Sequence, residues 1–235
     1  MFRLALTHRI AVAVAAVLMG AASSVCAYYD ANTGRTWRDL SDPAIRNFTW
    51  NEIAAVCPLD GITACDGSST LNTRDDAFTG WIWGTKDQVN DLFKHVTGLG
   101  SALDDYNERV LGKPFTWAPS AIAALGQTNS FSGDRIGHDA MGFTATELNS
   151  LRGIVGVIST CDGTPNPVTW CLLQPEQGDP ANDAFQMATL NLALLKETER
   201  GPVFSAFLFQ VPEPGTLALL GLGLAGLAAT RRRKQ

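Results

Sequence analysis

The chain has 235 residues, 46% of them hydrophobic, and a formal net charge of −5. This length and apolar fraction suit one folded domain with appendages, and they exclude a disordered chain. Six of the 18 basic residues lie at the extreme ends of the chain, which leaves 12 basic and 23 acidic residues in the segment between the two ends. A body with this excess of acidic residues repels phosphate, which excludes nucleic acid as a partner.

The first 27 residues have the three parts of a secretory signal peptide. A basic start is followed by the apolar run 10–19, which is too short to span a bilayer comfortably. Val25 and Ala27 then occupy the −3 and −1 positions of a cleavage site, so we predict cleavage after Ala27. An uncleaved anchor helix is the alternative. A signal that would lipidate Cys26 is disfavoured, because Val25 replaces the small residue expected before such a cysteine.

Three capping boxes predict helix starts in the body, because a Thr side chain and a Glu or Gln three residues later satisfy each other's backbone donors. The three pairs are Thr49/Glu52, Thr85/Gln88 and Thr144/Glu147. After the second pair, apolar residues recur at helical spacing over 89–96, and Gly98 is placed to end that helix. We expect a shorter helix over 102–111, after a cap at Ser101.

Strand signals are stronger late in the chain. Segment 154–160 is rich in β-branched residues and is followed by a Gly/Pro/Asn turn and segment 168–173, which predicts a hairpin. Segments 185–195 and 203–209 are expected to form a second strand pair. The earlier segment 78–83 is expected to be a central strand that runs into the helix after Thr85. Helices early and strands late predict an α+β fold, with several short helices on a mostly antiparallel sheet.

Four cysteines remain once the signal peptide, with Cys26, is removed. They are Cys57, Cys65, Cys161 and Cys171. An even number in an exported domain predicts two disulfides. Of the three pairings we favour the two local ones, 57–65 and 161–171, because each closes a loop rich in turn residues. A four-thiolate zinc site is disfavoured, because it usually needs Cys-x₂-Cys pairs.

The C-terminus combines a stiff joint, an uncharged apolar stretch and a basic end. Pro212, Glu213 and Pro214 form the joint, and prolines break a helix. The stretch 216–229 would form a helix about 21 Å long, against a hydrocarbon core of about 30 Å. The basic end consists of Arg231, Arg232, Arg233 and Lys234. Such an end stays in the cytoplasm, so we expect the body to face outward.

This tail resembles the PEP-CTERM sorting signal of Gram-negative bacteria, which Pro212, Glu213 and Pro214 match residue for residue. The resemblance implies handling by an exosortase, a membrane enzyme that recognises and processes the Pro-Glu-Pro segment. With the signal peptide, it implies three parts: signal peptide 1–27, extracellular domain 28–210 and sorting tail 211–235 with a short transmembrane helix. It also implies transient anchoring in the inner membrane and delivery to the cell surface. A generic tail anchor is the alternative.

A segment of the body carries a second likeness. Residues 80–93 resemble the "G-W-R-x-A-T-x-x-E-V-x-x-L-F" segment common in PEP-CTERM surface proteins. They are also similar to the "G-W-R-L-P-T-x-x-E" strand-to-helix step of C-type-lectin-like surface domains. Two positions depart from these motifs, since Ile82 replaces the Arg and Gln88 replaces the Glu. The lectin-like plan implies that the strands carrying the two chain ends pair with each other, and residues 37–41 and 207–209 fit those strands.

Two histidines in the body are the candidates for nucleophilic catalysis. His95 falls near the end of the helix after Thr85, where a cation favours the helix dipole, so we expect a structural role. His138 falls in a polar loop punctuated by glycines, without a hydrolase elbow, a zinc-protease pair or a phosphate-binding loop. We therefore expect no catalytic residue.

Acidic residues supply the remaining candidates. The adjacent pairs Asp75-Asp76 and Asp104-Asp105 are expected to be solvated rather than catalytic. We expect no metal site and no resident cofactor. Calcium is the alternative, because oxygen-rich Asp-Gly turns can ligate this hard cation. Those turns begin at Asp60, Asp66 and Asp162.

The sequence favours a non-catalytic protein of the cell surface or extracellular matrix, with exosortase and the inner membrane as partners of its tail and exopolysaccharide as a partner of its body. The first alternative is a carbohydrate- or ligand-binding module that uses exposed aromatic side chains such as Trp37, Trp117 or Trp170. The second is a secreted hydrolase that uses His138 with a serine or carboxylate partner.

Overall fold

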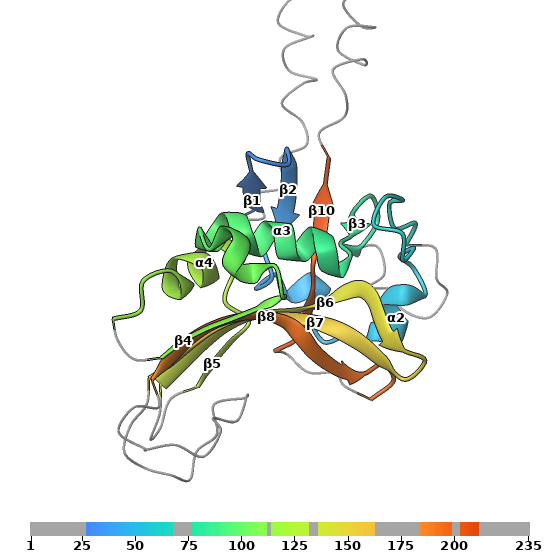
Figure 1. Ribbon diagram of the computed structural model, residues 1–235. Coiled ribbons are helices and arrows are strands. Elements are labelled where there is room, and N and C mark those ends of the chain that lie inside the picture. The colour runs from blue at the N-terminus through green and yellow to red at the C-terminus, as the bar shows by residue number, and fades with distance from the viewer. Residues whose placement is uncertain are drawn as a thin grey trace, which may run out of the picture.

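The computed structural model describes residues 27–67, 77–111, 114–131, 136–162, 184–198 and 203–211, and these form two sheets with short helices between and around them (Figure 1). Helices α3 and α4 lie over one face of the larger sheet, and the smaller sheet stands on the far side of α3. The predicted class is confirmed, since the sheets are mostly antiparallel and the helices are few and short.

The smaller sheet, here called the terminal sheet, joins the first described strands to the last. Its order is β1-β2-β10-β3, and each neighbouring pair is antiparallel. The strands are β1 (Ala27–Asp30), β2 (Arg35–Arg38), β10 (Leu208–Gln210) and β3 (Ile82–Trp83). Trp37 lies opposite Phe209 and Thr36 opposite Gln210. The predicted pairing of the strands at the two ends of the body is therefore confirmed.

The larger sheet has the order β4-β8-β7-β6-β5, and β9 adds to the edge of β6. Its strands are β4 (Asn107–Leu111), β5 (Asn129–Phe131), β6 (Ile136–Asn149), β7 (Arg152–Asp162), β8 (Phe185–Leu195) and β9 (Ser205–Ala206). All of these pairings are antiparallel except that of β6 with β9. The strands predicted over 154–160 and 185–195 are confirmed.

Two of the three predicted capping boxes are confirmed. The helices are α2 (Trp50–Ala54), α3 (Lys86–Thr97) and α4 (Ala118–Leu125), and the 3₁₀ turns are η1 (Pro43–Ile45) and η3 (Gly100–Leu103). Thr49 and Thr85 accept from the third backbone N–H of α2 and α3, and Glu52 and Gln88 accept from the cap backbone in return. Gly98 ends α3 with a φ of 73°, in the left-handed region that favours glycine.

The third predicted helix, after Thr144, is wrong, because β6 runs through this segment. The carbonyls of Phe143 and Thr144 accept hydrogen bonds from the indole N–H groups of Trp83 (3.0 Å) and Trp50 (2.9 Å). The Thr144 hydroxyl donates to the carbonyl of Ile154 on β7 (3.1 Å). A helix after Thr144 would need the Thr144 carbonyl as its first acceptor, and the long-range bond from Trp50 uses that carbonyl, so tertiary structure overrides the local signal.

The helix expected over 102–111 is wrong beyond its first turn. The 3₁₀ turn ends at Leu103, and Tyr106 has a φ of 59°, which an α-helix does not accommodate. The Tyr106 carbonyl accepts from the backbone N–H of Leu190 (2.8 Å), and the following residues form β4 beside β8. Pairing with β8 therefore replaces the helix.

Both predicted strand pairings in the last third of the chain are wrong. Strand β7 has β6 on one edge and β8 on the other from Arg152 to Cys161, so no edge is free for residues 168–173, which lie outside the described residues. Segment 203–209 does form strands, but they pair with β6, β2 and β3 rather than with β8. The strand predicted over 78–83 shortens to Ile82–Trp83, because residues 78–81 make a turn.

The segment 205–210 separates two hydrophobic clusters. Phe207 and Phe209 belong to the cluster with α3 and α4, whereas Ala206 and Leu208 belong to the cluster around α2. The alternation follows from the two-residue period of extended chain. Phe207 packs so closely on the larger sheet that a Cβ at Gly156 would lie 2.8 Å from its ring. The last strand of the body is thus part of both clusters.

In the part of the chain that the structure describes, no helix is both long enough and apolar enough to cross a bilayer. The predicted signal-peptide helix and the predicted membrane segment 216–229 lie outside that part.

Candidate functional site

The strand that leads into the predicted sorting tail is held on both edges. Gln210, the last residue of β10, lies opposite Thr36 of β2, and Phe209 lies opposite Ile82 of β3. Val211 follows directly and is 54% exposed. The chain therefore leaves the body from a central strand, without an intervening loop. The predicted tail residues Pro212, Glu213, Pro214, Arg231, Arg232, Arg233 and Lys234 lie outside the described residues.

Asp30 fixes the β1–β2 turn beside this exit. Its carboxylate accepts from the Thr33 hydroxyl (2.6 Å) and the Asn32 backbone N–H (3.0 Å), and it lies 2.9 Å from Nδ1 of His95. Burial raises the pKa of Asp30, but these hydrogen bonds outweigh burial and hold the pKa below the ordinary aspartate value. His95, expected to have a structural role at the end of α3, thus also ties α3 to the β1–β2 hairpin.

One predicted disulfide is confirmed. Cys57 and Cys65 are bonded to each other and are buried in the cluster around α2. Cys161 is also disulfide-bonded, and Cys171, its predicted partner, lies outside the described residues. The three described cysteines are therefore structural.

A pocket of about 310 Å³ lies between α4 and the larger sheet. Its apolar wall includes Phe115, Pro119 and Ile122, and its polar groups come from Gln127, His138 and Thr160. The loop expected around His138 is wrong, because His138 lies within β6. It is opposite Ser130 on β5 and Thr160 on β7, so the three side chains share one face of the sheet. No hydrogen bond joins the side chains of His138 and Ser130. The arrangement suits a small ligand with both apolar and hydrogen-bonding surface.

A glutamine side chain positions α4 above the sheet. Oε1 of Gln186 on β8 accepts from three consecutive backbone N–H groups at the start of α4, those of Thr116 (3.1 Å), Trp117 (3.2 Å) and Ala118 (3.3 Å). Trp117, the N-cap residue, makes no side-chain cap of its own. Helix α4 was missed by sequence reasoning, because its cap comes from a residue 68 positions away.

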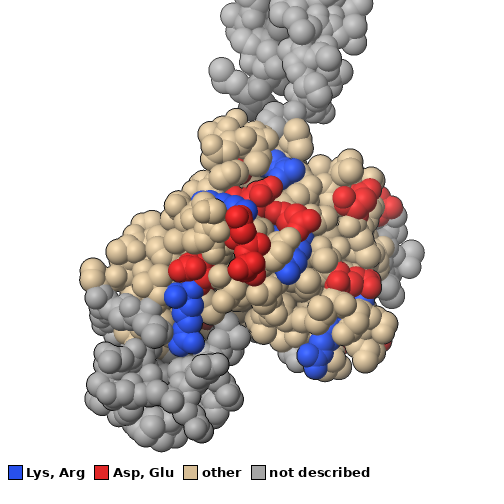
Figure 2. Space-filling model, viewed as in Figure 1, with Lys and Arg blue, Asp and Glu red and all other residues tan. Residues whose placement is uncertain are grey.

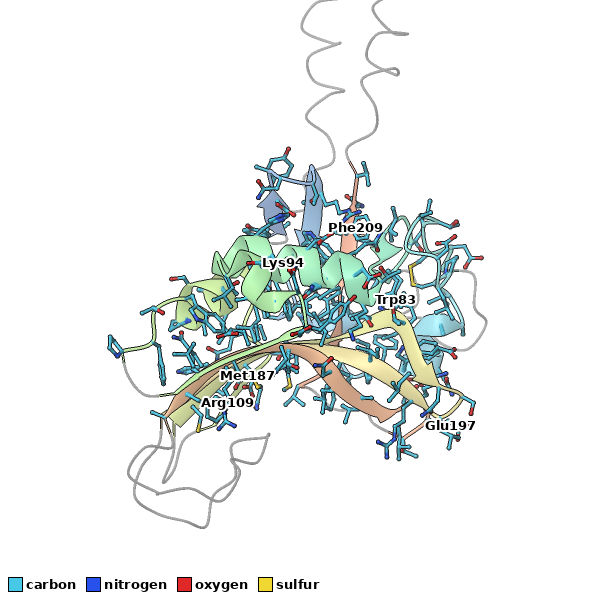
Figure 3. The ribbon with its side chains drawn as sticks, in the orientation of Figure 1. Trp83, Lys94, Arg109, Met187, Glu197 and Phe209 are labelled. Atoms are coloured by element: carbon cyan, nitrogen blue, oxygen red, sulfur yellow. A yellow bond between two sulfur atoms is a disulfide. The ribbon has the colours of Figure 1, made fainter. Side chains whose placement is uncertain are left out.

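A buried carboxyl lies on the opposite face of the larger sheet. Asp139 accepts hydrogen bonds from the Ser159 hydroxyl (2.5 Å) and from Nδ2 of Asn129 (3.1 Å). Burial nevertheless raises the pKa of Asp139 above the ordinary aspartate value. Figure 3 shows Met187 and Arg109 on this same side of the sheet, away from the helices. Asp139 therefore faces away from the neighbouring His138 and does not orient that ring.

The described aspartates that were considered for catalysis or calcium binding do not form a metal-binding cluster. Asp60 makes a local turn, in which it accepts from the backbone N–H groups of Ile62 and Thr63 (both 2.8 Å). Asp104 pairs with Lys94 at 2.5 Å. Among the described residues, no three His, Cys, Asp or Glu side chains are grouped so as to hold a metal ion. Asp75, Asp76 and the side chain of Asp162 lie outside the described part.

The tryptophans proposed for sugar binding are not available as an exposed platform. Trp37 is 1% exposed and packs against Phe207 and Phe209, and Trp117 is 9% exposed under α4. Trp170 lies outside the described residues. The version of the binding hypothesis that rests on Trp37 and Trp117 is therefore wrong.

In the comparison with known proteins, a family model described as the PEP-CTERM protein-sorting motif matches residues 210–234. No curated protein and no solved structure matches the chain. The match begins at Gln210, the last residue of β10, so the motif and the body adjoin at a single residue. A motif of this kind implies processing by an exosortase, export, and sorting through the membrane toward the cell surface.

Proposed function

We propose, from the sorting motif at residues 210–234, that this protein is an exported, non-catalytic component of the cell surface or extracellular matrix. The observation that carries the proposal is the junction of motif and body at Gln210. Because β10 ends there, an enzyme that cuts within the tail would release a body whose strands are all retained. Exosortase is the proposed partner of the tail, and exopolysaccharide the proposed partner of the released body.

Two features of the body support export. The disulfide between Cys57 and Cys65 is buried in the cluster around α2, and such bonds persist in oxidising compartments. Cleavage after Ala27 would remove the first residue of β1 and leave Tyr28, Tyr29 and Asp30 paired with β2. Both ends of the body are thus folded up to the sequences that direct its delivery.

The absence of an enzymatic role is supported by the pocket beside α4. A hydrolytic triad needs an acid that orients its histidine. The described lining of this pocket contains His138 but no carboxylate, and the adjacent Asp139 faces the other side of the sheet. We propose that this pocket performs no hydrolysis.

The motif itself provides the direct test. We expect the triple variant Pro212→Ala, Glu213→Ala, Pro214→Ala to fold but to remain with the inner membrane, because the processing enzyme loses its recognition segment. Cell fractionation and intact mass of the recovered protein measure location and both termini. Glu197→Ala, a Glu-to-Ala change on the exposed surface of the body, is the matched control and should be processed normally. Equal processing and delivery of the triple variant would contradict the proposal.

A second candidate, a carbohydrate- or ligand-binding surface module, is favoured by the mixed lining of the pocket beside α4. Phe115 offers a ring for stacking, and His138 and Thr160 offer hydrogen-bonding groups. If the body binds neutral oligosaccharides there, titration calorimetry will detect binding that Phe115→Ala weakens at least tenfold, which corresponds to about 1.4 kcal/mol. Tyr29→Ser, a substitution at an exposed aromatic side chain outside the pocket, is the control.

A further inference from the structure

We propose that the β1–β2 turn and Val211 form a surface that contacts the lipid bilayer while the tail is still embedded in it. This inference rests on the proposed membrane passage of the tail, and it adds an orientation of the body on the membrane. Four observations carry it: the short junction, the direction of β10, the exposed residues at this end, and the distribution of charge.

The junction between body and tail is short. Residues 211–215 separate Gln210 from the apolar stretch that begins at Thr216. Five residues span at most about 18 Å when fully extended. The headgroup layer occupies roughly 5–8 Å of that span. The end of β10 therefore lies within about 13 Å of the membrane surface when the apolar stretch is inside the bilayer.

The β1–β2 turn extends beyond the end of β10 in the direction of the tail. Gln210 is level with Thr36, and β2 runs antiparallel to β10. Arg35 and turn residues 31–34 therefore continue past Gln210 on the side from which Val211 leaves. An extended residue advances about 3.3 Å, so the turn closes much of the remaining gap to the headgroups.

The exposed groups at this end match a membrane interface. Tyr29 is 56% exposed and Val211 is 54% exposed. Tyrosine is enriched at the level of lipid headgroups. Arg35 contributes a cation, whose guanidinium lies over the Phe209 ring at 4.8 Å. The one acidic residue of strand β1 and the turn, Asp30, is fully buried and hydrogen-bonded.

The acidic residues of the body lie elsewhere. Figure 2 shows Asp and Glu gathered in the middle of the face that α3 crosses. Exposed acidic residues on α3 and directly after η3 are Asp87, Asp91, Asp104 and Asp105. A bilayer that contains anionic lipid repels that face, whereas the turn with Arg35 is the end that such a surface attracts. Charge and tether length therefore favour the same orientation.

Fluorescence quenching in reconstituted vesicles tests this orientation with the full chain. Thr33→Cys, in the β1–β2 turn, and Ser150→Cys, in the β6–β7 turn, each receive a fluorophore on the introduced thiol. The labelled proteins are reconstituted into vesicles of phosphatidylcholine with a minor share of phosphatidylglycerol and a lipid that carries a quencher near its headgroup. We expect the label at position 33 to lose most of its emission and the label at position 150 to lose none.

A lengthened junction separates tethered contact from accidental contact. A Gly/Ser insertion after Val211, twice as long as segment 211–215, should restore most of the emission at position 33, because the body then leaves the surface. Equal quenching at positions 33 and 150, or quenching at 33 that the insertion leaves unchanged, would overturn the inference. Failure of the full chain to co-sediment with the vesicles would instead contradict the membrane passage on which the proposed function depends.

Discussion

The two sheets differ in how far apart in the sequence their paired strands lie. In the larger sheet, β6 and β7 have 14 and 11 residues and are joined by a tight turn in which Asn149 lies opposite Arg152. In the terminal sheet, β2 and β10 have 4 and 3 residues, and their pairing brings Thr36 to Gln210. Closing so long a loop costs chain entropy that a few backbone hydrogen bonds do not offset.

This difference shows where the terminal sheet finds its stability. Phe207, Leu208 and Phe209 are each at most 2% exposed and contribute to both hydrophobic clusters. The terminal sheet therefore depends on side chains that pack against the larger sheet and α3, whereas the larger sheet has extensive pairing of its own. The sorting motif is therefore attached to the terminal sheet, whose stability depends more on packing against the rest of the body.

The largest expected effect comes from truncation on either side of β10. A chain that ends at Pro202 lacks β9, β10 and three large buried side chains, those of Phe207, Leu208 and Phe209, each of which contributes about 1.5–3 kcal/mol by burial. Since domains of this size are stable by about 5–15 kcal/mol, we expect loss of cooperative unfolding, measured by circular dichroism during urea titration. A chain that ends at Val211 should unfold as the full body does. Cooperative folding of the shorter chain would show that the rest of the larger sheet needs neither its edge strand β9 nor strand β10 of the terminal sheet.

The next effect in size isolates one side chain between the sheets. Phe207→Ala should lower the free energy of unfolding by about 3–5 kcal/mol, because the ring fills the space between Trp37, Phe93 and the larger sheet. Gly156→Ala presses on the same ring from the sheet side and should cost about 1–3 kcal/mol. Urea unfolding measures both, and a loss below about 1 kcal/mol for Phe207→Ala would mean that the sheets are not coupled there.

Sequence reasoning worked best where local signals and tertiary structure agree. The cap pairs Thr49/Glu52 and Thr85/Gln88 satisfy backbone donors within their own helices, so a reader of the sequence finds them. The same pattern at Thr144 failed, because indole N–H groups from Trp50 and Trp83 occupy the carbonyls of that segment. Whether a capping box acts depends on partners that lie far away in the sequence.

The pocket shows the same limit. His138 was recognised as a candidate, but its surroundings were not, because α4 carries no capping side chain of its own. The acceptor for the start of α4 is Gln186, in a strand at the other end of the body sequence. The available signal was Gln186 between the apolar residues Phe185 and Met187, but Thr189 and Asn191 are polar residues of the same strand, so it did not single out Gln186. The junction at Gln210 needed no such long-range knowledge, since the Pro-Glu-Pro motif is local.

A smaller effect is expected at Gln186 on β8 of the larger sheet, whose side-chain oxygen accepts hydrogen bonds from the start of α4. Gln186→Met leaves the N–H groups of Thr116, Trp117 and Ala118 without this acceptor and should cost about 1–3 kcal/mol in urea unfolding. Gln186→Glu keeps the acceptor at the helix start but buries a carboxylate and loses the hydrogen bond that Nε2 donates to the Thr116 hydroxyl, so it should lose less stability than Gln186→Met without matching the parent. Equal losses for both variants would mean that side-chain shape, not the hydrogen bonds, matters at this position.

The smallest expected effect is on the pH dependence of stability, which differs between a carboxyl in the terminal sheet and one in the larger sheet. In the terminal sheet the pKa of Asp30 is lowered in the folded protein, so its contribution is present above the unfolded pKa of roughly 4 and is lost as pH falls through the folded value. In the larger sheet the pKa of Asp139 is raised, so the unfolded state ionises first and stability falls as pH rises from the unfolded to the folded value. The two carboxyls thus affect stability with opposite sign.

Substitution by asparagine makes this contrast measurable. The stability of Asp30→Asn relative to the parent should become less favourable as pH rises from the lowered folded pKa to roughly 4 and should stay level above that, because the parent alone gains the hydrogen-bonded carboxylate. For Asp139→Asn the relative stability should become more favourable as pH rises from roughly 4 through the raised folded pKa, because the variant has no buried carboxyl to ionise. Taking each variant against the parent at the same pH removes the titration of all other groups. Parallel trends for the two variants would mean that the two carboxyls experience the same balance of burial and hydrogen bonding, contrary to the partners that Thr33 and Ser159 supply.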